Sequence, residues 1–314
     1  MANHTAIPHN LWTDYPFYYT PRPSVLPGVS DQALALAAPI IAYWVASLAF
    51  HALDISDWRW LDKYRLHDST EVASRNLVTR TTVVWAVLLQ QAIQTALGIF
   101  WMSDEGHEVN HAAEMQQVAA LIARVSPMIL GNSVAESWLK SEAHRLTYFS
   151  YWWFIPAIQL LWAMCIMDTW QYFLHRGMHV NKFLYKHLHS VHHRLYVPYA
   201  FGALYNHPLE GFLLDSVGAV LSETLSFMTV RQAAFFFVFS TFKTVDDHCG
   251  YSLPFDPLQW ISGNTADYHD IHHQVIGIKS NFSQPFFVHW DMLLGTRMTR
   301  KEIEQRRAKT RKAE

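Results

Sequence analysis

Residues 168–194 read DTWQYFLHRGMHVNKFLYKHLHSVHHR, and they place two histidine motifs directly after a long apolar run. The first motif is HxxxH, formed by His175 and His179, and the second is HxxHH at residues 189–193. A third motif, again HxxHH, stands at residues 269–273. On an α-helix of 3.6 residues per turn, positions i, i+3 and i+4 lie on one face. Each motif can therefore aim its imidazoles at one point, and the pattern predicts a single histidine-rich centre.

The number of clustered imidazoles indicates two metal ions rather than one. Structural zinc takes four protein ligands and catalytic zinc usually three, whereas the three motifs supply eight imidazoles. Imidazole suits iron, zinc and copper, so the motifs alone do not identify the metal. The acids nearest in sequence, Asp168, Asp267 and Asp270, are candidates for orienting the ligand rings. The eight candidate metal ligands are His175, His179, His189, His192, His193, His269, His272 and His273.

The chain has 19 histidines, and 11 of them fall between the start of the first motif and the end of the third. His207 (in NHPLE) and His248 (in DDHCGY) lie between the motifs and are further candidate ligands. His187 lies on a different helix face from His189, and His289 is interpreted as structural. The isolated histidines are interpreted as surface or packing residues: His4, His9, His51, His67, His107, His111 and His144.

Composition and apolar runs predict a membrane protein. Charged residues make up 16% of the chain, against about 25% in ordinary globular domains. A helix needs about 20 apolar residues to cross a bilayer, and three runs have that length: residues 33–53, 81–101 and 151–170. Gln90, Gln91 and Gln94 in the second run are expected to face protein rather than lipid. Residues 212–230 and 233–245 form a fourth apolar region, read either as two spans or as a hairpin that dips into the membrane.

The distribution of positive charge predicts the orientation in the membrane. The loop between the first two spans carries five lysines and arginines, and residues 299–314 form a basic tail. Basic loops stay in the cytosol, so the third span is expected to deliver the histidine motifs to the cytosolic side. Residues 56–80 are expected to form an amphipathic helix on the membrane surface, and residues 110–145 a helical insertion on the luminal side.

Several function classes are disfavoured. The net charge of −2 gives no basic surface for nucleic acid. Cys165 lies in an apolar run, so a disulfide with Cys249 is not expected, and no CxxC motif indicates a zinc or redox site. No signal peptide is expected, because residues 1–10 lack a basic and an apolar region. A carboxylate-bridged di-iron bundle needs two ExxH motifs, and the chain has one, from Glu108 to His111.

The three histidine motifs in this order after apolar spans resemble the fatty acid hydroxylase/sterol desaturase superfamily. The resemblance covers roughly residues 63–298. Three stretches are similar, more narrowly, to the fungal sphinganine C4-hydroxylases: ALYNHPLEGFLLD at 203–215, TVDDHCGYSLPFDPLQW at 244–260 and NTADYHDIHHQVIGIKSNFSQPFFVHWD at 264–291.

The resemblance implies an all-α integral membrane protein of the endoplasmic reticulum, with about four transmembrane helices and a cytosolic helical cap that holds two iron ions. It implies that the eight motif histidines are iron ligands, and it supports His248 as well. The implied activity is the O2-dependent hydroxylation of sphinganine, or dihydroceramide, to 4-hydroxysphinganine (phytosphingosine). The implied segments are an interfacial N-terminus (1–32), a membrane hairpin with amphipathic connections (33–149), a catalytic domain (150–298) and a cytosolic tail (299–314).

The resemblance also implies an external source of electrons. Some relatives carry a fused cytochrome b5 domain with an HPGG haem motif, but here His207 and Pro208 are followed by Leu209 and Glu210. Electrons are therefore expected from a separate cytochrome b5 and its reductase, which draws on NADH or NADPH.

Three rival hypotheses stay open at the level of sequence. The same histidines would serve a sterol C4-methyl oxidase, a sterol C5-desaturase or a fatty acid hydroxylase. A metal transporter would place its ligands near the bilayer midplane, whereas these motifs stand in polar sequence beyond the spans. A haem electron carrier needs only one or two axial histidines.

Overall fold

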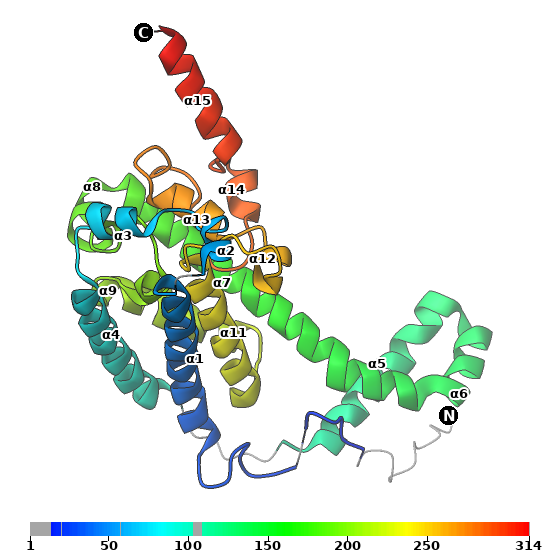
Figure 1. Cartoon of the computed structure of the whole chain (residues 1–314). Helices are drawn as coiled ribbons and strands as arrows, with labels where there is room; N and C mark the ends of the chain where they lie inside the picture. The colour runs from blue at the N-terminus through cyan, green and yellow to red at the C-terminus, as the bar shows by residue number, and fades with distance from the viewer. Residues whose placement is uncertain (1–13, 20, 57, 103–108, 314) are drawn as a thin grey trace. The chain divides into compact units, whose positions relative to one another are not determined.

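The structure is a computed structural model that describes residues 14–19, 21–56, 58–102 and 109–313 (Figure 1). Every regular element in these ranges is a helix. The chain divides into two compact units. We call residues 1–31 with 104–161 the hairpin unit, and residues 32–103 with 162–314 the histidine unit. His4, His9, His107 and Glu108 lie outside the described residues.

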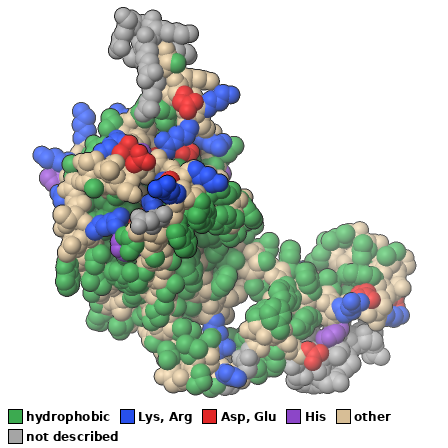
Figure 2. All heavy atoms as spheres, in the orientation of Figure 1, with side chains coloured by type: hydrophobic (Ala, Val, Ile, Leu, Met, Phe, Trp, Pro, Cys, Tyr) green, Lys and Arg blue, Asp and Glu red, His purple; other side chains and the backbone are tan. Residues whose placement is uncertain are grey.

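Three helices among the described residues are long and apolar enough to cross a membrane. They are α1 (Asp31–Asp54), α4 (Arg80–Trp101) and one continuous helix, Asn132–Val180. Large apolar side chains point outward from the first two; Ile41 is 61% exposed and Trp85 68%. Figure 2 shows hydrophobic side chains over the part of the histidine unit that holds α1 and α4, and charged side chains over its other end. The protein is therefore a multi-pass, all-helical membrane protein.

The third spanning helix is longer than the sequence predicted. It joins α6 (Asn132–Phe149), the π-helical turn η2 (Ser150–Phe154) and α7 (Ile155–Val180) without a break. We expected residues 110–145 to form a separate luminal insertion. The residues from Asn132 onward instead belong to the long helix that is a spanning candidate. No glycine or proline lies between Ser133 and Ile155 to stop the helix.

The glutamines of α4 face protein, as predicted. Gln90 and Gln91 are 2% and 6% exposed. Gln91 Oε1 accepts a hydrogen bond from Trp44 Nε1 at 3.0 Å, and Gln90 Nε2 donates to Asp215 Oδ2 at 3.1 Å. Lipid offers polar groups no partner, so these contacts come from protein, although Gln90 Oε1 and Gln91 Nε2 have no partner among the described residues.

The fourth apolar region forms shorter helices: α9 (Pro208–Gly211), the π-helical η6 (Phe212–Ser216), α10 (Val217–Leu225) and α11 (Val230–Asp247). A capping box starts α11, because the Thr229 side chain accepts from the Gln232 main chain and the Gln232 side chain accepts from Thr229 N. These helices are not among the three spanning candidates, and a fourth crossing stays a prediction.

The main core of the histidine unit fixes the loop that follows the second histidine motif. Tyr43 of α1, Val83 of α4 and Val245 of α11 are fully buried against residues 195–205. Burying one such side chain contributes roughly 1.5–3 kcal/mol. The Tyr43 hydroxyl donates to the main-chain oxygen of Phe201 at 2.7 Å. The 3-10 turn η5 (Ala200–Leu204) is thereby held against the spanning helices.

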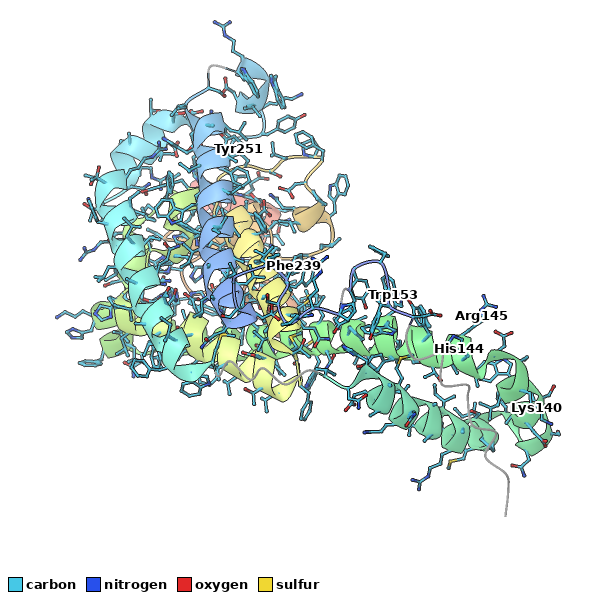
Figure 3. All side chains as sticks on the ribbon, turned by 90° about the horizontal axis from the view of Figure 1, so that it is seen from below. Lys140, His144, Arg145, Trp153, Phe239 and Tyr251 are labelled. Atoms are coloured by element: carbon cyan, nitrogen blue, oxygen red, sulfur yellow. The ribbon has the colours of Figure 1, made fainter. Side chains whose placement is uncertain are left out.

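Residues 56–80 do not form the single surface helix that we expected. They form two short helices, α2 (Arg59–Asp62) and α3 (Ser69–Arg75). Between them Arg65 forms an isolated antiparallel bridge with Tyr251, in which Leu66 N donates to Gly250 O at 2.9 Å and Ser252 N to Tyr64 O at 2.8 Å. Tyr251, which Figure 3 labels, lies between those two partners. Its hydroxyl donates to Asp54 Oδ1 at 3.0 Å.

The cap of the histidine unit holds four further helices: α12 (Pro257–Trp260), α13 (Ala266–His273), α14 (His289–Leu293) and α15 (Arg300–Ala313). Helix α13 carries the third histidine motif, and the Thr265 side chain caps it by accepting from Tyr268 N at 3.2 Å. The chain turns back at Gly277, where a Cβ atom would lie 1.9 Å from the Ile271 oxygen. Only glycine permits this approach.

Two buried carboxylates, those of Asp168 and Asp291, accept hydrogen bonds from the main chain of residues 280–287. Asp168 of α7 accepts hydrogen bonds from Phe286 N at 3.0 Å and Phe287 N at 2.6 Å. Asp291 accepts from Phe282 N at 3.1 Å, from Ser283 N at 2.6 Å, from the Thr296 hydroxyl at 2.6 Å and from the Tyr268 hydroxyl. These bonds fix the main chain of the loop, whose carbonyl oxygens at Ser280 and Phe282 contact His272 and His175.

In the hairpin unit, α5 (His111–Leu130) packs on α6 and η2. Met115 and Trp152 form its small buried core. His111 contacts the hydroxyl of Tyr151 at 2.7 Å and that of Tyr19 at 2.5 Å. These partners confirm the interpretation of His111 as a structural residue.

Replacing Asp291 with alanine is expected to destabilise the protein strongly. The change removes the acceptor of four donors, two in the 280–287 loop and the hydroxyls of Tyr268 and Thr296, and the expected loss is more than about 3 kcal/mol. The control is Asp62→Ala, which removes a 65% exposed carboxylate paired with Arg65 at 3.2 Å and should cost less than about 1 kcal/mol. Thermal unfolding in detergent measures both; equal shifts in Tm would contradict the role given to Asp291.

Candidate metal centre

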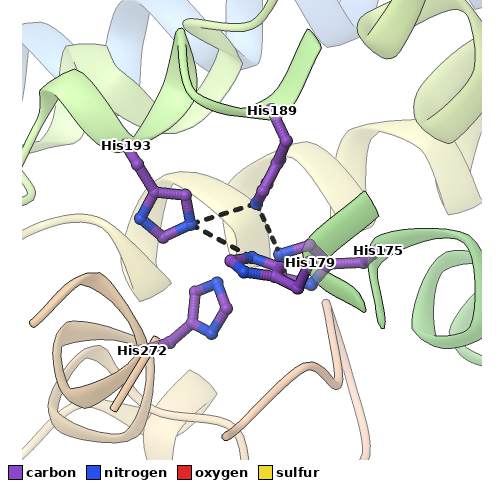
Figure 4. Close-up of side chains that lie close together, drawn as sticks. All are labelled: His175, His179, His189, His193 and His272. Atoms are coloured by element: carbon purple, nitrogen blue, oxygen red, sulfur yellow. Dashed lines mark hydrogen bonds between the residues drawn. The ribbon is translucent and has the colours of Figure 1, made fainter. Parts of the chain in front are cut away.

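Nine buried histidines form two adjacent groups whose side-chain nitrogens converge. The ligand atoms within each group lie within 4.8 Å of one another. Rings of the two groups also touch: the centroids of His193 and His273 are 4.8 Å apart. The five-histidine group, drawn in Figure 4, consists of His175, His179, His189, His193 and His272. The four-histidine group consists of His192, His248, His269 and His273.

Four segments of the chain supply these rings. Helix α7 places His175 and His179 one turn apart near its end. Asn181 follows α7 and caps the short α8 (Lys182–Leu184), with its side chain accepting from Phe183 N and Leu184 N. The second motif lies on a π-turn, η3 (Tyr185–His189), and a 3-10 turn, η4 (His192–Arg194). The third motif lies on α13, and His248 ends α11.

The HxxHH motifs divide between the two groups rather than aiming at one point, as the spacing had suggested. His189 and His193 belong to the five-histidine group, whereas His192 faces the other. Likewise His272 separates from its neighbour His273. The two HxxHH segments lie between the groups and contribute to both, so the eight motif residues and His248 form one continuous centre.

Main-chain carbonyls fix the tautomer of five of these rings. A carbonyl oxygen only accepts, so the ring nitrogen Nδ1 must carry the hydrogen and Nε2 must keep its lone pair. A lone pair at Nε2 is what a metal ion requires of imidazole. The Nδ1 contacts are His175 to Phe282 O (2.8 Å), His192 to Tyr205 O (3.1 Å), His248 to Thr244 O (2.8 Å), His272 to Ser280 O (2.7 Å) and His273 to Leu195 O (2.7 Å).

The spacing of the Nε2 atoms fits a bound cation. His269 Nε2 lies 3.0 Å from His248 Nε2 and 3.1 Å from His273 Nε2. Both of those partners present lone pairs, and His269 Nε2 carries one hydrogen at most. A shared cation would satisfy all three nitrogens together. With metal–nitrogen bonds of about 2.1 Å, neighbouring ligands stand about 3.0 Å apart in an octahedron and about 3.4 Å apart in a tetrahedron.

The five-histidine group shows the same crowding (Figure 4). His193 Nε2 lies 3.0 Å from His189 Nε2 and 3.2 Å from His179 Nε2. His272 Nε2 is buried and has no hydrogen-bond partner among the described residues. An unpartnered buried nitrogen costs about 1–3 kcal/mol, and a metal ion in the group would offset that cost.

Electrostatics keep these imidazoles neutral. Burial and the neighbouring His248 lower the pKa of His192 to about 3. Burial is also the main cause that lowers the pKa of His248 to about 4. The pKa values of His272 and His273 are lowered in the same way. Neutral imidazole is the form that binds metal, so the centre is prepared for cations at neutral pH.

Glu210 is a functional residue that the sequence reasoning missed. Its carboxylate Oε1 accepts from His189 Nδ1 at 2.5 Å, and the residue is fully buried. Burial, with Asp215 adding repulsion, raises the pKa of Glu210 to about 8. A cation on His189 Nε2 would favour the carboxylate form, because the ring then donates more strongly to it. The sequence signal was its place in NHPLE, beside the candidate His207.

The acids that we expected to orient the ligands lie elsewhere. Asp168 holds the 280–287 loop, as described above. Asp267 and Asp270 both accept from the Arg300 guanidinium, the first at 2.6 Å. Asp270 also contacts His67 Nε2 at 2.8 Å. The carbonyls of the main chain take the role that had been expected of these carboxylates.

His207 is not brought to either group. Its Nδ1 accepts from Leu209 N at 3.2 Å, which caps α9. His187 is exposed and packs on Phe183, with ring centroids 4.5 Å apart. Neither arrangement offers a nitrogen to the centre.

A cavity adjoins both groups. Its wall includes four of the ligand histidines and a set of polar side chains. The lining residues are His189, His192, His248, His269, Gln171, Ala203, Asn206, Glu210, Leu214, Asp215, Thr244, Asp247, Gln284 and Pro285. Its volume of about 30 Å³ has room for about one or two water molecules next to the ligand rings.

Comparison with known proteins identifies the family of this chain. The family model for fatty acid hydroxylase matches residues 160–296. The sphingolipid C4-hydroxylase SUR2 of Saccharomyces cerevisiae is 47% identical over 281 residues, which cover 88% of this chain and 74% of that protein. This chain belongs to the fatty acid hydroxylase family. Like the family's members, it is an oxidoreductase, with two histidine groups able to hold metal ions.

Two further relatives have different names. Sphinganine C4-monooxygenase 2 of Arabidopsis thaliana is 45% identical over 268 residues, 85% of this chain and 88% of the relative. Very-long-chain aldehyde decarbonylase GL1-9 of Oryza sativa subsp. japonica is 44% identical over 272 residues, 86% of this chain and 90% of the relative. No solved structure matches the chain.

We expect two metal ions per chain, and we expect each histidine group to lose its own ion when a ligand is removed. His179→Ala should lower the metal content from two to about one, and His248→Ala should do the same through the other group. His207→Ala is the matched control and should retain both ions. Elemental analysis of purified protein measures the content; loss of metal from His207→Ala equal to that from His248→Ala would refute the division.

The metal-free protein should lose stability as the pH falls below about 6.5, the usual pKa of histidine. The folded pKa values are lowered, for example to about 3 for His192, so the unfolded chain binds more protons below 6.5. The free energy of unfolding then decreases with decreasing pH and is retained above 6.5. Carboxyl groups with a raised pKa, such as Glu210, act in the opposite direction. They offset only a part of the loss of stability, because fewer carboxyl groups than histidines are shifted.

Unfolding of the metal-depleted protein in detergent between pH 7.5 and 5 measures this effect. The expected slope exceeds one proton per chain. A midpoint that does not change over this range contradicts the burial of neutral histidines.

Proposed function

We propose that this protein is a sphinganine C4-hydroxylase, a di-iron monooxygenase that converts sphinganine, or dihydroceramide, to 4-hydroxysphinganine with O2. One observation carries the proposal: nine buried imidazoles form two adjacent groups in a membrane protein. The relatives named for this activity are 45–47% identical over most of the chain, which supports the choice of substrate.

Iron ions in the two groups would supply the oxidising power for an unactivated C–H bond, which side-chain acid–base chemistry does not break. The chain's own residues prepare that chemistry. Carbonyls such as those of Ser280 and Phe282 orient the rings, and Glu210 holds His189. Every ligand histidine is at most 9% exposed, so the surrounding protein excludes bulk water from the reacting carbon.

The proposal includes a location and partners. We infer that the enzyme lies in the endoplasmic reticulum membrane with its cap in the cytosol, where cytochrome b5 and an NAD(P)H-dependent reductase would supply electrons. The basic loops support this orientation. We assign the catalytic domain to 150–298, which agrees in extent with the family match at 160–296. The segments 1–32, 33–149 and 299–314 are proposed as interfacial, membrane and tail segments.

Other reactions on the same centre are alternatives that the product distinguishes. A relative named aldehyde decarbonylase is 44% identical to this chain, and a sterol oxidase, desaturase or fatty acid hydroxylase would use the same imidazoles. A metal transporter is less well supported. Transport requires ligands that release the ion, whereas main-chain carbonyls hold the rings of this centre in place.

Expression in a host that lacks 4-hydroxysphinganine tests the proposal by lipid mass spectrometry. The wild type should add one oxygen atom to the sphingoid base. His192→Ala and His272→Ala should abolish the product while the protein still accumulates, and the control His187→Ala, at an exposed position, should retain it. A new double bond, a shortened hydrocarbon or an oxidised sterol in place of the added oxygen would assign one of the rival reactions instead.

A further inference from the structure

The stretch of chain that carries the first two histidine motifs contains bases and no acids. Between Asp168 and Glu210 the sequence has no aspartate or glutamate, although acids outnumber bases in the whole chain, 26 to 24. The bases in this stretch are Arg176, Lys182, Lys186 and Arg194. The protein around these two motifs is therefore locally positive.

Three of these bases lie at the surface. Lys182, Lys186 and Arg194 are exposed, and within the described residues no ion pair reaches them. Elsewhere on the cap, bases have acidic partners, as Arg75 has in Glu71 at 3.2 Å. Surface cations that the protein itself does not balance attract an acidic partner.

Two of the exposed lysines share their side of the chain with an aromatic pair. Lys182 and Lys186 are four positions apart on a helical segment, as are Phe183 and His187, and all four residues are exposed. Phe183 is 68% exposed, and its ring centroid lies 4.5 Å from that of His187. We call these four residues the α8 face. Aromatic side chains with charged groups around them are typical of protein–protein interfaces.

The inner side of the same turns belongs to the histidine centre. His189 lies on η3 and is 1% exposed. Between the α8 face and the centre stands the half-buried Tyr185, whose ring centroid is 5.5 Å from that of His179 and 5.9 Å from that of His193. A helical turn is roughly 10 Å across. A protein docked on the α8 face would therefore lie about one helix diameter from the five-histidine group.

The α8 face belongs to the cap rather than to the lipid-facing part of the histidine unit. Figure 1 places α8 in the cap, beyond the ends of α1 and α4. Figure 2 shows charged side chains over this end of the unit and hydrophobic side chains over the part that holds α1 and α4. This position favours a protein partner over the head groups of the bilayer.

The proposed reaction requires electrons from another protein. Hydroxylation places one oxygen atom of O2 in the C–H bond and releases the other as water, which takes up two electrons and two protons for each product. Electron transfer through protein slows steeply as the distance grows. The donor must therefore dock close to the histidines, and its docking surface must be reachable from the aqueous phase.

We propose that the α8 face is the docking surface for an acidic electron-carrier protein, whose carboxylates pair with Lys182 and Lys186. The inference rests on the proposed function and adds the place and the residues at which the donor docks. A haem carrier gives up one electron in each encounter, so two encounters serve one product. Docking through long exposed lysines gives a fast and short-lived complex, which suits a carrier that must leave after each transfer.

Binding of an acidic cytochrome b5 to the metal-loaded full-length protein in neutral detergent tests the docking surface. The wild type should bind it, and binding should weaken as salt is added, because salt screens exposed charges. The double variant Lys182→Glu/Lys186→Glu should raise Kd at least about 10-fold, because it sets like charges against each other. Its metal content should stay unchanged. Should it not accumulate, Lys182→Gln/Lys186→Gln is expected to raise Kd in the same direction by a smaller factor.

Arg59→Glu/Lys63→Glu is the matched control. It makes the same change of charge at two exposed positions of the cap, on α2 and at the residue that follows it. It should bind cytochrome b5 as the wild type does. If both double variants lose affinity equally, only the overall charge of the cap matters and the α8 face is not the docking surface.

Electron transfer shows whether the docked complex is productive. Oxidation of reduced cytochrome b5 by the metal-loaded protein is followed through the haem absorbance. Its second-order rate constant in Lys182→Glu/Lys186→Glu should fall at least about 10-fold at low salt. Reduction of the same variant by dithionite, a small ion that needs no docking surface, should proceed as in the wild type. An unchanged rate with cytochrome b5 would contradict the assignment.

The outcomes separate this inference from the proposed function. If the wild type forms 4-hydroxysphinganine but does not bind cytochrome b5, or if the Lys182→Glu/Lys186→Glu variant binds it with wild-type affinity, the docking surface is overturned and the hydroxylase proposal stands. It is also overturned if that variant loses affinity only for vesicles that contain anionic phospholipid, because the lysines then contact the membrane. If no 4-hydroxysphinganine is formed, the proposed function itself fails.

Discussion

The hydrogen bonds from imidazole Nδ1–H groups to main-chain carbonyls are the constraint on which the centre depends. Each one fixes a tautomer and a ring direction together, and they turn the lone pairs of His175, His192, His248, His272 and His273 inward. A main-chain acceptor cannot rotate away as a side chain can. The rigidity of the centre is therefore the rigidity of the loops that carry those oxygens.

Those loops are held by groups that lie well outside the histidine motifs. Tyr43 on a spanning helix fixes residues 195–205 through Phe201 O. Asp168 and Asp291 fix residues 280–287. The membrane helices and the cap thus each fix loops whose carbonyl oxygens orient the histidine rings. This explains why a metal centre built almost wholly from imidazole is embedded in a network of buried carboxylates.

Much of the centre was predictable from sequence, because histidines at i, i+3 and i+4 leave few other interpretations. The spacing brought eight rings together correctly, and the structure also places His248, the further candidate between the motifs, with them. The division into two groups was not predictable, since it depends on a π-turn and a 3-10 turn around His189 and His192. Glu210 was missed because its partner, His189, is 21 positions away. His207 had the right residue type but a local capping role.

The carbonyl partners also determine when the centre can form during synthesis. His175 is translated more than a hundred residues before Phe282, whose oxygen orients it. A ribosome-bound chain that ends between residues 273 and 280 contains all nine rings but not the oxygens that direct His175 and His272. A cation that needs these oriented rings would thus bind only after residues 280–282 have been added to the chain.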